Sequence, residues 1–543
     1  MPDGDRLHHA TLKYSDDFYP GTGPHRVRRG PSPGRNLWYL YKGHPTQLFI
    51  PCAAKEIARL TAETPRLRRN SLGLPELVFQ GVTHIAPATN MVFTFPIIAL
   101  KAGPDMPLSF MLATIICFFI GNTVSQFSQY MPSSGSYYSF ATRGLGNRIG
   151  FMAAWSYLTY DILGSAGSTG FLGYLISDML RTALHVNVPW WLIALVMFAV
   201  IWMLTHYGIQ LSARITAILG GLELLIMLSL AITFLLHPGP GSTYAAPLTP
   251  SLSPHHFGGI LAGMVFSILA LSGFEGCAPL AQESRRAGKS IGQAVMLSLV
   301  ATGSFFIFAS YASAIGWGTG NMAAFASDPN PYYAMGHALW GAGWWLVVLA
   351  VINSSIGVGL ASTNSASRVM YTMGQAGTLP ARFGQIHPIH QTPTFAIAFF
   401  QIVGIVAMLL VGLLLRPDYI FGLLETIATL AVIVIYCTAN VALTSYIRRE
   451  HPGDYSVWKH LVSPWVATVA LLPVLFVTIY PVPAWPYNIA PYLFLAALVA
   501  GFVYMQRLES RKPGSLLRGA TMMVGSRSNS DGDVDWDKPI APR

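Results

Sequence analysis

Twelve apolar stretches, each long enough to cross a lipid bilayer as a helix, restrict this chain to very few folds. Of its 543 residues, 52% are hydrophobic and only 10% are charged, whereas soluble domains carry about 25% charged residues. Backbone N–H and C=O groups in lipid need partners within the protein, so these stretches are expected to be helical. The sequence therefore predicts an all-α integral membrane protein. The predicted spans are residues 76–101, 107–131, 149–180, 189–207, 211–237, 258–282, 291–317, 344–374, 394–416, 419–447, 464–481 and 487–507.

The basic residues are distributed unevenly around these spans. The net charge is +10. Alternate loops hold most of the arginines and lysines, whereas the other set of loops holds only Lys101, Arg181 and Arg416. This asymmetry is the positive-inside pattern of a multi-pass protein in the cell (plasma) membrane, with both termini cytoplasmic. Residues 1–70, in which we find no secretory signal, and residues 511–543 are expected to be disordered cytoplasmic tails.

The sequence does not point to catalysis or to a bound metal. Its cysteines, Cys52, Cys117, Cys277 and Cys437, show no CxxC or metal-ligand spacing. No nucleotide-binding loop, zincin motif or nucleophile elbow occurs, and short loops leave no room for a soluble catalytic domain. We therefore expect no enzyme activity, no cofactor and no metal. The positive charge follows the membrane topology, so we also expect no nucleic-acid partner.

The predicted span 258–282 is interrupted by Gly273-Phe274-Glu275. A carboxylate within a membrane span is costly unless the helix opens there onto a polar cavity. Secondary transporters build their mid-membrane sites from such interrupted helices. The alternative is a glycine kink in an ordinary packed helix, with Glu275 paired to a neighbour.

The first predicted span carries a second interruption, in the run HIAPATN at residues 84–90. Proline removes a backbone donor and clashes with the preceding turn, so we expect this helix to break near Ala86. Spans one and six stand five apart. A pair of broken helices at equivalent positions is typical of two inverted five-helix repeats with a site between them. The alternative is two unrelated kinks.

Further motifs follow in order along the chain. Residues 131–138 read MPSSGSYY, residues 272–275 read SGFE, residues 281–284 read AQES, and residues 367–374 read SRVMYTMG. Together they resemble the amino acid–polyamine–organocation (APC) permease superfamily. The resemblance implies a transporter domain over residues 71–510 with twelve transmembrane helices, a five-plus-five inverted repeat, and alternating-access transport of amino acids or amines.

The chain departs from the pattern of that family at three points. Members usually break the first helix with a glycine-rich stretch, where this chain has Ala86-Pro87-Ala88, so its backbone cradle is expected to differ. Many relatives carry an aromatic gate on helix six, where this chain has Leu269 and Leu271. Some proton-coupled relatives place a lysine in helix five, and residues 211–237 contain none.

The two breaks define the expected substrate site. Exposed N–H groups after Pro87 would receive a carboxylate, because the helix dipole is positive there. Carbonyls near Ser272 would accept from an ammonium group, and Asp161 in the third span would attract a cationic head group or a second amine. The alternative role of Asp161 is a structural hydrogen bond between helices. The expected substrate-binding residues are Ile85, Ala86, Pro87, Ala88, Thr89, Tyr160, Asp161, Ser165, Leu269, Leu271, Ser272, Gly273 and Phe274.

Three buried ionisable residues, Glu275, Glu223 and His84, are the candidates for proton coupling, because burial favours the neutral forms of carboxylates and histidines. Glu275 is the first candidate among them because it lies at the break in the sixth span. Glu425 is expected to join helices by a hydrogen bond, and His206 to be an interfacial anchor.

These features together predict a secondary active transporter (permease) that takes up an amino acid or related amine with protons, or with sodium as the alternative ion. Two other functions stay open: an exchanger of amines without ion coupling, and a membrane sensor that binds the same ligands without moving them.

Overall fold

The structure is a computed structural model, and it describes residues 66–183, 185–328, 330–480, 484–516, 532–534 and 536. The chain divides into two units, residues 1–63 and 64–543. The first unit, and with it most of the predicted N-terminal tail and Cys52, lies outside the described residues, as does most of the predicted C-terminal tail. In the second unit, Gly532 O accepts a hydrogen bond from Gly288 N at 3.2 Å.

The described residues form helices and connecting turns, with a single β-bridge between Leu72 and Ser284. The all-α prediction is confirmed for this part of the chain. The α-helices are α2 Leu74–Ile85, α3 Pro87–Phe93, α4 Phe95–Ala102, α5 Met106–Tyr130, α6 Tyr137–Leu145, α7 Asn147–Ala183, α8 Trp190–His206, α9 Ile209–Leu236, α10 His256–Leu271, α11 Ala287–Trp317, α12 Met322–Ser327, α13 Pro331–Trp340, α14 Trp345–Gln375, α15 Thr394–Leu414, α16 Ile420–Glu450, α17 Ser463–Ile479 and α18 Ala490–Arg511.

Within the described ranges, nine helical segments are long and apolar enough to cross a membrane. The predicted first, third and fourth spans are not among these nine. The first is divided into the short helices α2, α3 and α4, of which α4 belongs to the segment Phe95–Tyr130, and α8 is apolar but only 17 residues long. Helix α7 has 37 residues, but Tyr157, Tyr160, Asp161 and several serines lower its hydropathy. The nine segments are Phe95–Tyr130, Ile209–Leu236, His256–Glu283, Ala287–Trp317, Pro331–Gln375, Thr394–Leu414, Pro417–Glu450, Trp458–Ile479 and Tyr487–Arg511.

Both predicted helix breaks are confirmed. Ala86, between α2 and α3, has φ +56°, in the left-handed region, and Pro87 begins α3. Helix α10 ends at Leu271, Gly273 has φ +111°, and the chain continues as the 3₁₀ helix η4, Phe274–Glu283. The two breaks touch, because a Cβ atom added to Gly273 would lie 2.8 Å from the carbonyl carbon of His84. Glycine is therefore required at this position both for its φ angle and for the close approach of the two chains.

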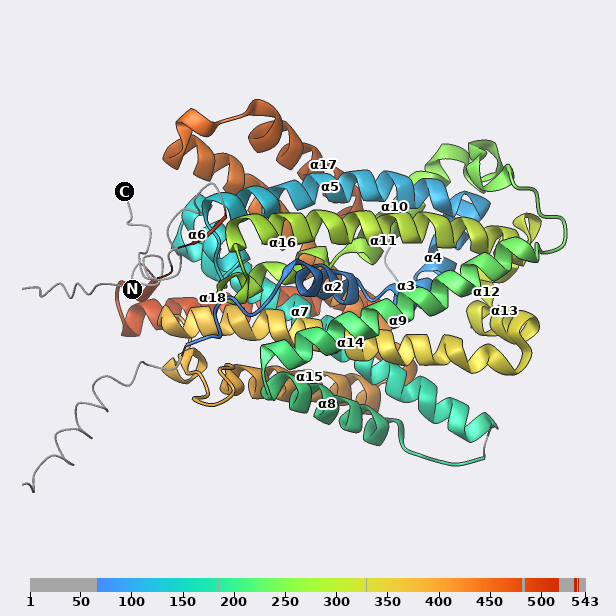
Figure 1. The fold of residues 1–543 in the computed structure, drawn as a ribbon, viewed down its shortest axis with the longest axis horizontal. Coiled ribbons are helices and arrows are strands. Elements are labelled where there is room, and N and C mark those ends of the chain that lie inside the picture. The colour runs from blue at the N-terminus through green and yellow to red at the C-terminus, as the bar shows by residue number, and fades with distance from the viewer. Residues whose placement is uncertain are drawn as a thin grey trace, which may run out of the picture. The chain divides into compact units, whose positions relative to one another are not determined.

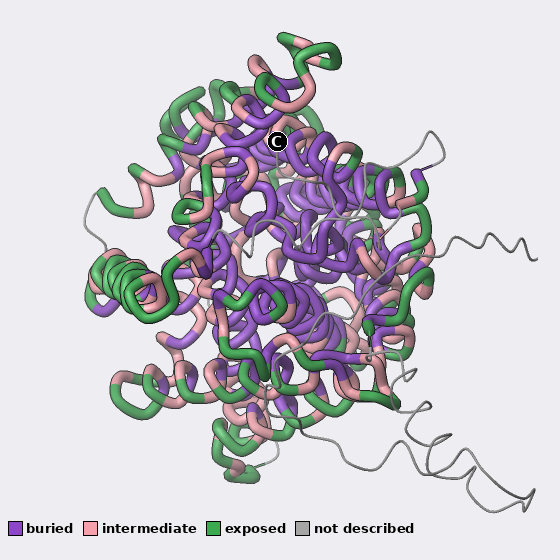
Figure 2. The backbone as a smooth tube through the Cα atoms, turned by 90° about the vertical axis from the view of Figure 1, so that its left-hand side faces the viewer, coloured by how far each residue is buried: buried purple, intermediate pink, exposed green. Residues whose placement is uncertain are grey.

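Helices α2 and α3 run through the middle of the second unit, between α5 and α11 on one side and α9 and α14 on the other (Figure 1). Helix α7 packs along α16 and α14. Buried residues gather in the interior and exposed ones on the outward faces of the peripheral helices (Figure 2). The breaks thus lie deep inside the bundle.

Large apolar side chains cover the outward helix faces. Ile218 and Leu225 on α9 are 68% and 63% exposed, and Ile402 on α15 and Phe476 on α17 are each 60% exposed. Such a surface would be costly in water, at about 25 cal/mol per Å² of apolar area, but not in contact with lipid tails. The outward faces therefore suit a membrane environment.

Candidate functional site

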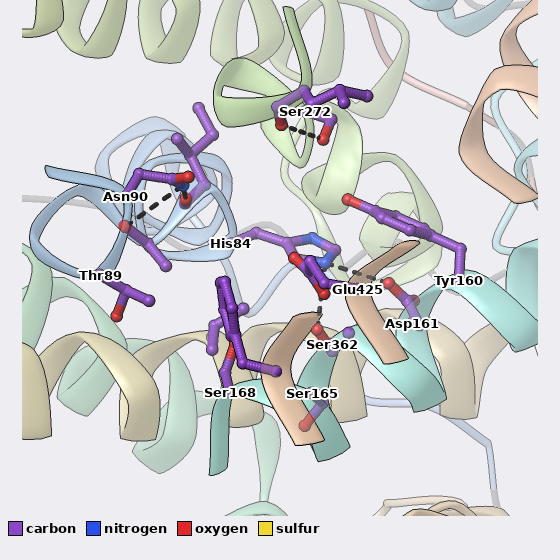
Figure 3. A pocket seen from close by; sticks show the side chains of 16 residues that line it. His84, Thr89, Asn90, Tyr160, Asp161, Ser165, Ser168, Ser272, Ser362 and Glu425 are labelled. Atoms are coloured by element: carbon purple, nitrogen blue, oxygen red, sulfur yellow. Dashed lines mark hydrogen bonds and ion pairs between the residues drawn. The ribbon is translucent and has the colours of Figure 1, made fainter. Parts of the chain in front are cut away.

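A cavity lies beside the two helix breaks, between α2, α3, α7, α10, α14 and α16. About 480 Å³ of empty space lies between its lining atoms, including the part open to solvent. Figure 3 shows the polar side chains that converge on this space. The lining residues are His84, Ile85, Ala86, Thr89, Asn90, Tyr160, Asp161, Gly164, Ser165, Ser168, Leu269, Ser272, Val358, Ser362, Phe421 and Glu425.

His84 and Asp161 form the polar centre of the cavity. His84 Nε2 lies 3.0 Å from Asp161 Oδ1 and 3.1 Å from Ser362 Oγ, so the imidazole connects α2 to α7 and α14 (Figure 3). The His84 and Asp161 side chains are 2% and 0% exposed. The Tyr160 ring stacks on the imidazole at a centroid distance of 5.9 Å. The imidazole is thereby held in one orientation just before the break in the first span.

Side-chain donors form hydrogen bonds with some of the carbonyl groups that the helix breaks leave without a helical partner. Asn90 Nδ2 donates to Ile85 O at 2.5 Å and to Ala270 O at 3.2 Å, which joins the two broken helices. Ser272 Oγ donates to Leu269 O at 2.6 Å. The Asn90 side chain therefore links the two broken helices across the site.

The N–H groups at the start of α3 already have partners. Ala88 N donates to Glu223 Oε2 at 3.4 Å, and Thr89 N donates to Ser354 Oγ at 3.3 Å. Ala88, Glu223 and Ser354 do not line the cavity. The backbone N–H groups at the N-terminus of α3 therefore donate to side chains of α9 and α14.

Glu275 is buried behind the second break. Its Oε2 accepts from Tyr436 OH at 2.7 Å and from Gly273 N at 3.1 Å. Phe274 stacks on the same tyrosine at a centroid distance of 5.8 Å. Glu275 is 0% exposed and does not line the cavity, so it holds η4 against α16.

Of the sixteen residues predicted for substrate or proton, nine line the cavity and seven do not. The seven outside it are Pro87, Ala88, Leu271, Gly273, Phe274, Glu275 and Glu223. Seven further lining residues were not among the predicted site residues: Asn90, Gly164, Ser168, Val358, Ser362, Phe421 and Glu425. Glu425 was expected to join helices, but its carboxylate within a membrane span is a signal that could have identified it as a site residue, because such carboxylates mark function more often than structure.

Three phenylalanines, one of which lines the cavity, pack against one another. The ring centroids of Phe93 and Phe171 are 5.0 Å apart, those of Phe93 and Phe421 5.3 Å, and those of Phe171 and Phe421 5.8 Å. Phe421 lines the cavity, and Phe93 lines a second, more apolar one that includes Asp178 and Trp344. This ring cluster therefore has one member in each of the two cavities.

A buried ion pair joins α14 to η4. Arg368 Nε lies 2.9 Å from Glu283 Oε2 and Arg368 Nη2 lies 3.1 Å from Glu283 Oε1, and both side chains are 0% exposed. Ser365 Oγ, one turn earlier on α14, donates to Gly276 O at 2.6 Å. The segment after the second break is thus fastened to α14 at two points.

Three histidines gather where α8 ends. Ligand atoms of His206, His387 and His390 lie within 4.8 Å of one another, a spacing that suits a metal ion. His387 Nδ1, however, accepts from Ile389 N and His390 N at 3.3 and 3.2 Å. Histidines that bind a metal normally donate a hydrogen bond from their second ring nitrogen, so His387 is poorly prepared as a metal ligand.

The cysteines Cys117, Cys277 and Cys437 are free thiols.

Comparison with known proteins agrees with this architecture. The sequence model of the family described as "Amino acid permease" matches residues 77–512. The branched-chain amino acid permease BcaP of Bacillus subtilis is 27% identical over 79% of this chain and 91% of its own length. The low-affinity putrescine importer PlaP of Escherichia coli is 26% identical over 65% of this chain and 77% of its own length. Human cationic amino acid transporter 4 is 24% identical over 68% of this chain and 61% of its own length.

Proposed function

The chain belongs to the amino acid permease family, a family of multi-pass membrane transporters, and on that premise we propose that it is a secondary active transporter for an amino acid or related amine. The observation that carries the proposal is the cavity between the two broken helices, with His84 and Asp161 at its centre. Buried ionisable groups placed at a mid-bundle helix break suit the reversible binding of a charged solute. The names of the relatives, which include a branched-chain amino acid permease and a putrescine importer, support this class of substrate.

We propose twelve membrane spans for this transporter. Helices α2–α3, α7 and α8 would supply the three spans that are not among the nine segments long and apolar enough. The breaks then fall in the first and sixth spans, five apart, which favours a five-plus-five inverted repeat. The positive-inside asymmetry favours cytoplasmic termini in the plasma membrane.

Alternating access with proton coupling is the proposed mechanism. The two repeats would rock around the cavity, and a buried ionisable group would take up and release a proton as its hydration changes. Glu275, Glu223 and His84 are the proposed carriers. His84 has the most direct claim because it alone of the three lines the cavity.

Uptake of labelled substrates into proteoliposomes tests the proposal. Accumulation that requires an inward pH gradient supports proton symport. Movement only when the vesicles are preloaded with a second amine indicates exchange. Binding without movement indicates a sensor and contradicts the transport function.

Labelling with an impermeant thiol reagent in intact cells tests the proposed topology. A cysteine at Ser515 should be shielded, and a cysteine at Ser242 should react. The opposite pattern would overturn the orientation inferred from the charge distribution.

A further inference from the structure

We propose that the start of α11 is a docking surface for the C-terminal tail of this same chain, and that the docked tail restrains the two broken helices. The docking is argued from contacts alone, whereas the restraint rests on the proposed transport function. The docked segment, as far as the structure describes it, consists of Gly532, Asp533, Val534 and Trp536.

The backbone of the docked segment lies directly on the first turn of α11. Gly532 O accepts from Gly288 N at 3.2 Å. Gly532 is buried and has φ +86°, and a Cβ atom added to it would lie 2.7 Å from Lys289 Cβ and 3.3 Å from Arg286 O. The first N–H groups of a helix have no partner within that helix. The tail therefore supplies an acceptor that α11 itself cannot, through a residue that has to be glycine for both its φ angle and its close approach.

Apolar side chains of the docked segment extend this contact. Val534 and Trp536 are half-buried, and both pack against the main hydrophobic core of the second unit. Burial of apolar area is the main favourable contribution to such an association. The tail is therefore held by its side chains as well as by its backbone.

The charges of the two partners are complementary. Arg285, Arg286 and Lys289 are exposed around the start of α11, and the helix dipole adds positive potential there. The tail reads DGDVDWD at residues 531–537, with four aspartates and no basic residue. Exposed charges attract each other weakly and are screened by salt. The docking is thus expected to be specific in sign, reversible and sensitive to ionic strength.

The docking surface adjoins the joint between the two broken helices. Ser71 N and Leu72 N donate to Glu283 O at 2.8 and 3.0 Å, and Arg285 N donates to Leu72 O at 2.9 Å. These bonds join the chain that enters α2 to the chain that leaves η4, and α2 also packs against η4. Arg286, which contacts Gly532, is the next residue after this joint.

The position of the docked segment gives it an effect on transport. During alternating access, the halves of the broken helices on this side of the cavity would move apart from their neighbours. A contact made in one conformation and lost in another shifts the equilibrium toward the first. The docked tail therefore favours the present arrangement of α2 and η4, and its release speeds the cycle.

Hydrogen exchange of the Gly288 amide in the purified full-length protein tests the docking. Gly532→Val, in which the new side chain would overlap Lys289, should speed this exchange about two- to fivefold, as loss of a weak surface contact predicts. Removal of residues 531–543 should do the same. Gly514→Val is the matched control, because Gly514 also has a positive φ, +75°, but an added Cβ there meets no atom within 4 Å. Unchanged exchange in both Gly532→Val and the shortened protein would mean that something else, such as a lipid headgroup, covers the amide, and would overturn the docking.

Initial rates of uptake into proteoliposomes test the restraint, with labelled leucine and labelled putrescine as probes. Gly532→Val and the shortened protein should take up substrate about two- to fivefold faster than the wild type and the Gly514→Val control. Added salt should raise the wild-type rate toward theirs and leave the shortened protein unchanged. Faster amide exchange with equal or slower uptake would overturn the restraint. Absence of uptake by every protein, the wild type included, would contradict the transport function instead, and the exchange measurement would still decide the docking.

Discussion

His84 Nε2 lies 3.0 Å from Asp161 Oδ1, and this contact ties the last turn of α2 before the first break to the middle of α7. The imidazole also meets Ser362 of α14 at 3.1 Å. Three helices that surround the cavity are therefore held by one side chain. A ligand that competes for Asp161 would change the contacts of all three.

Asp161→Asn is expected to destabilise the protein and to abolish tight binding of a cationic ligand. A buried hydrogen bond to a charged group is typically worth about 1.5–3 kcal/mol. Thermal unfolding in detergent and ligand titration on the same preparation measure both effects. Asp178→Asn is the control, because its pair with Arg181 is exposed and should contribute little. A variant as stable as the wild type, with unchanged affinity, would contradict the role given to this pair.

Gly276→Ala is expected to impair ligand binding through His84. An added methyl group would overlap the Nδ1 atom of His84, which packs against this glycine. The imidazole would have to move away from Asp161, and a shift of about 1 Å is enough to weaken a site of this kind. Affinity should fall more strongly than in the Gly221→Ala control, whose methyl group meets no neighbour within 4 Å. Equal affinities in the two variants would show that the ring position is not critical.

Glu275→Gln tests proton coupling. Glutamine preserves the shape and keeps an oxygen to accept from Tyr436, so substrate exchange should persist while uptake driven by a pH gradient is lost. Counterflow and pH-driven uptake on one proteoliposome preparation make the distinction. Tyr436→Phe is the companion variant, since it removes the hydroxyl and keeps the carboxylate. Full pH-driven accumulation by Glu275→Gln would end the coupling assignment, and equal loss of both transport modes would favour a purely structural role.

Arg368→Met is expected to cost about 3–5 kcal/mol in the free energy of unfolding, because it leaves Glu283 charged and unpaired in the interior. The double variant Arg368→Met/Glu283→Leu should recover most of that loss, since apolar replacements of a buried pair are often neutral. Denaturant titration measures the coupling. Additive losses in the double variant would contradict a direct interaction between the two residues. Arg416→Met, from an exposed pair with Asp418, is the surface control.

Local chemistry was sufficient to predict the backbone of the site. Pro87 removes a donor in the middle of an apolar span, and Gly273 permits a positive φ, so both breaks could be located before any contact was known. Which side chains face the cavity was harder to predict. Leu271 and Phe274 neighbour the second break in sequence, yet they face the packed interior, because rotation about each helix axis is set by its neighbours.

The sequence by itself determined the helical class, the apolar spans and the two breaks, because these depend on hydropathy and on backbone chemistry within one segment. Only the tertiary structure decided the partners. It paired His84 with Asp161 and Arg368 with Glu283, over separations of 77 and 85 residues. It also left Glu425 Oε2 without a hydrogen-bond partner among the described residues. Such relationships depend on how distant helices dock, and side-chain geometry within one segment carries no information about that docking.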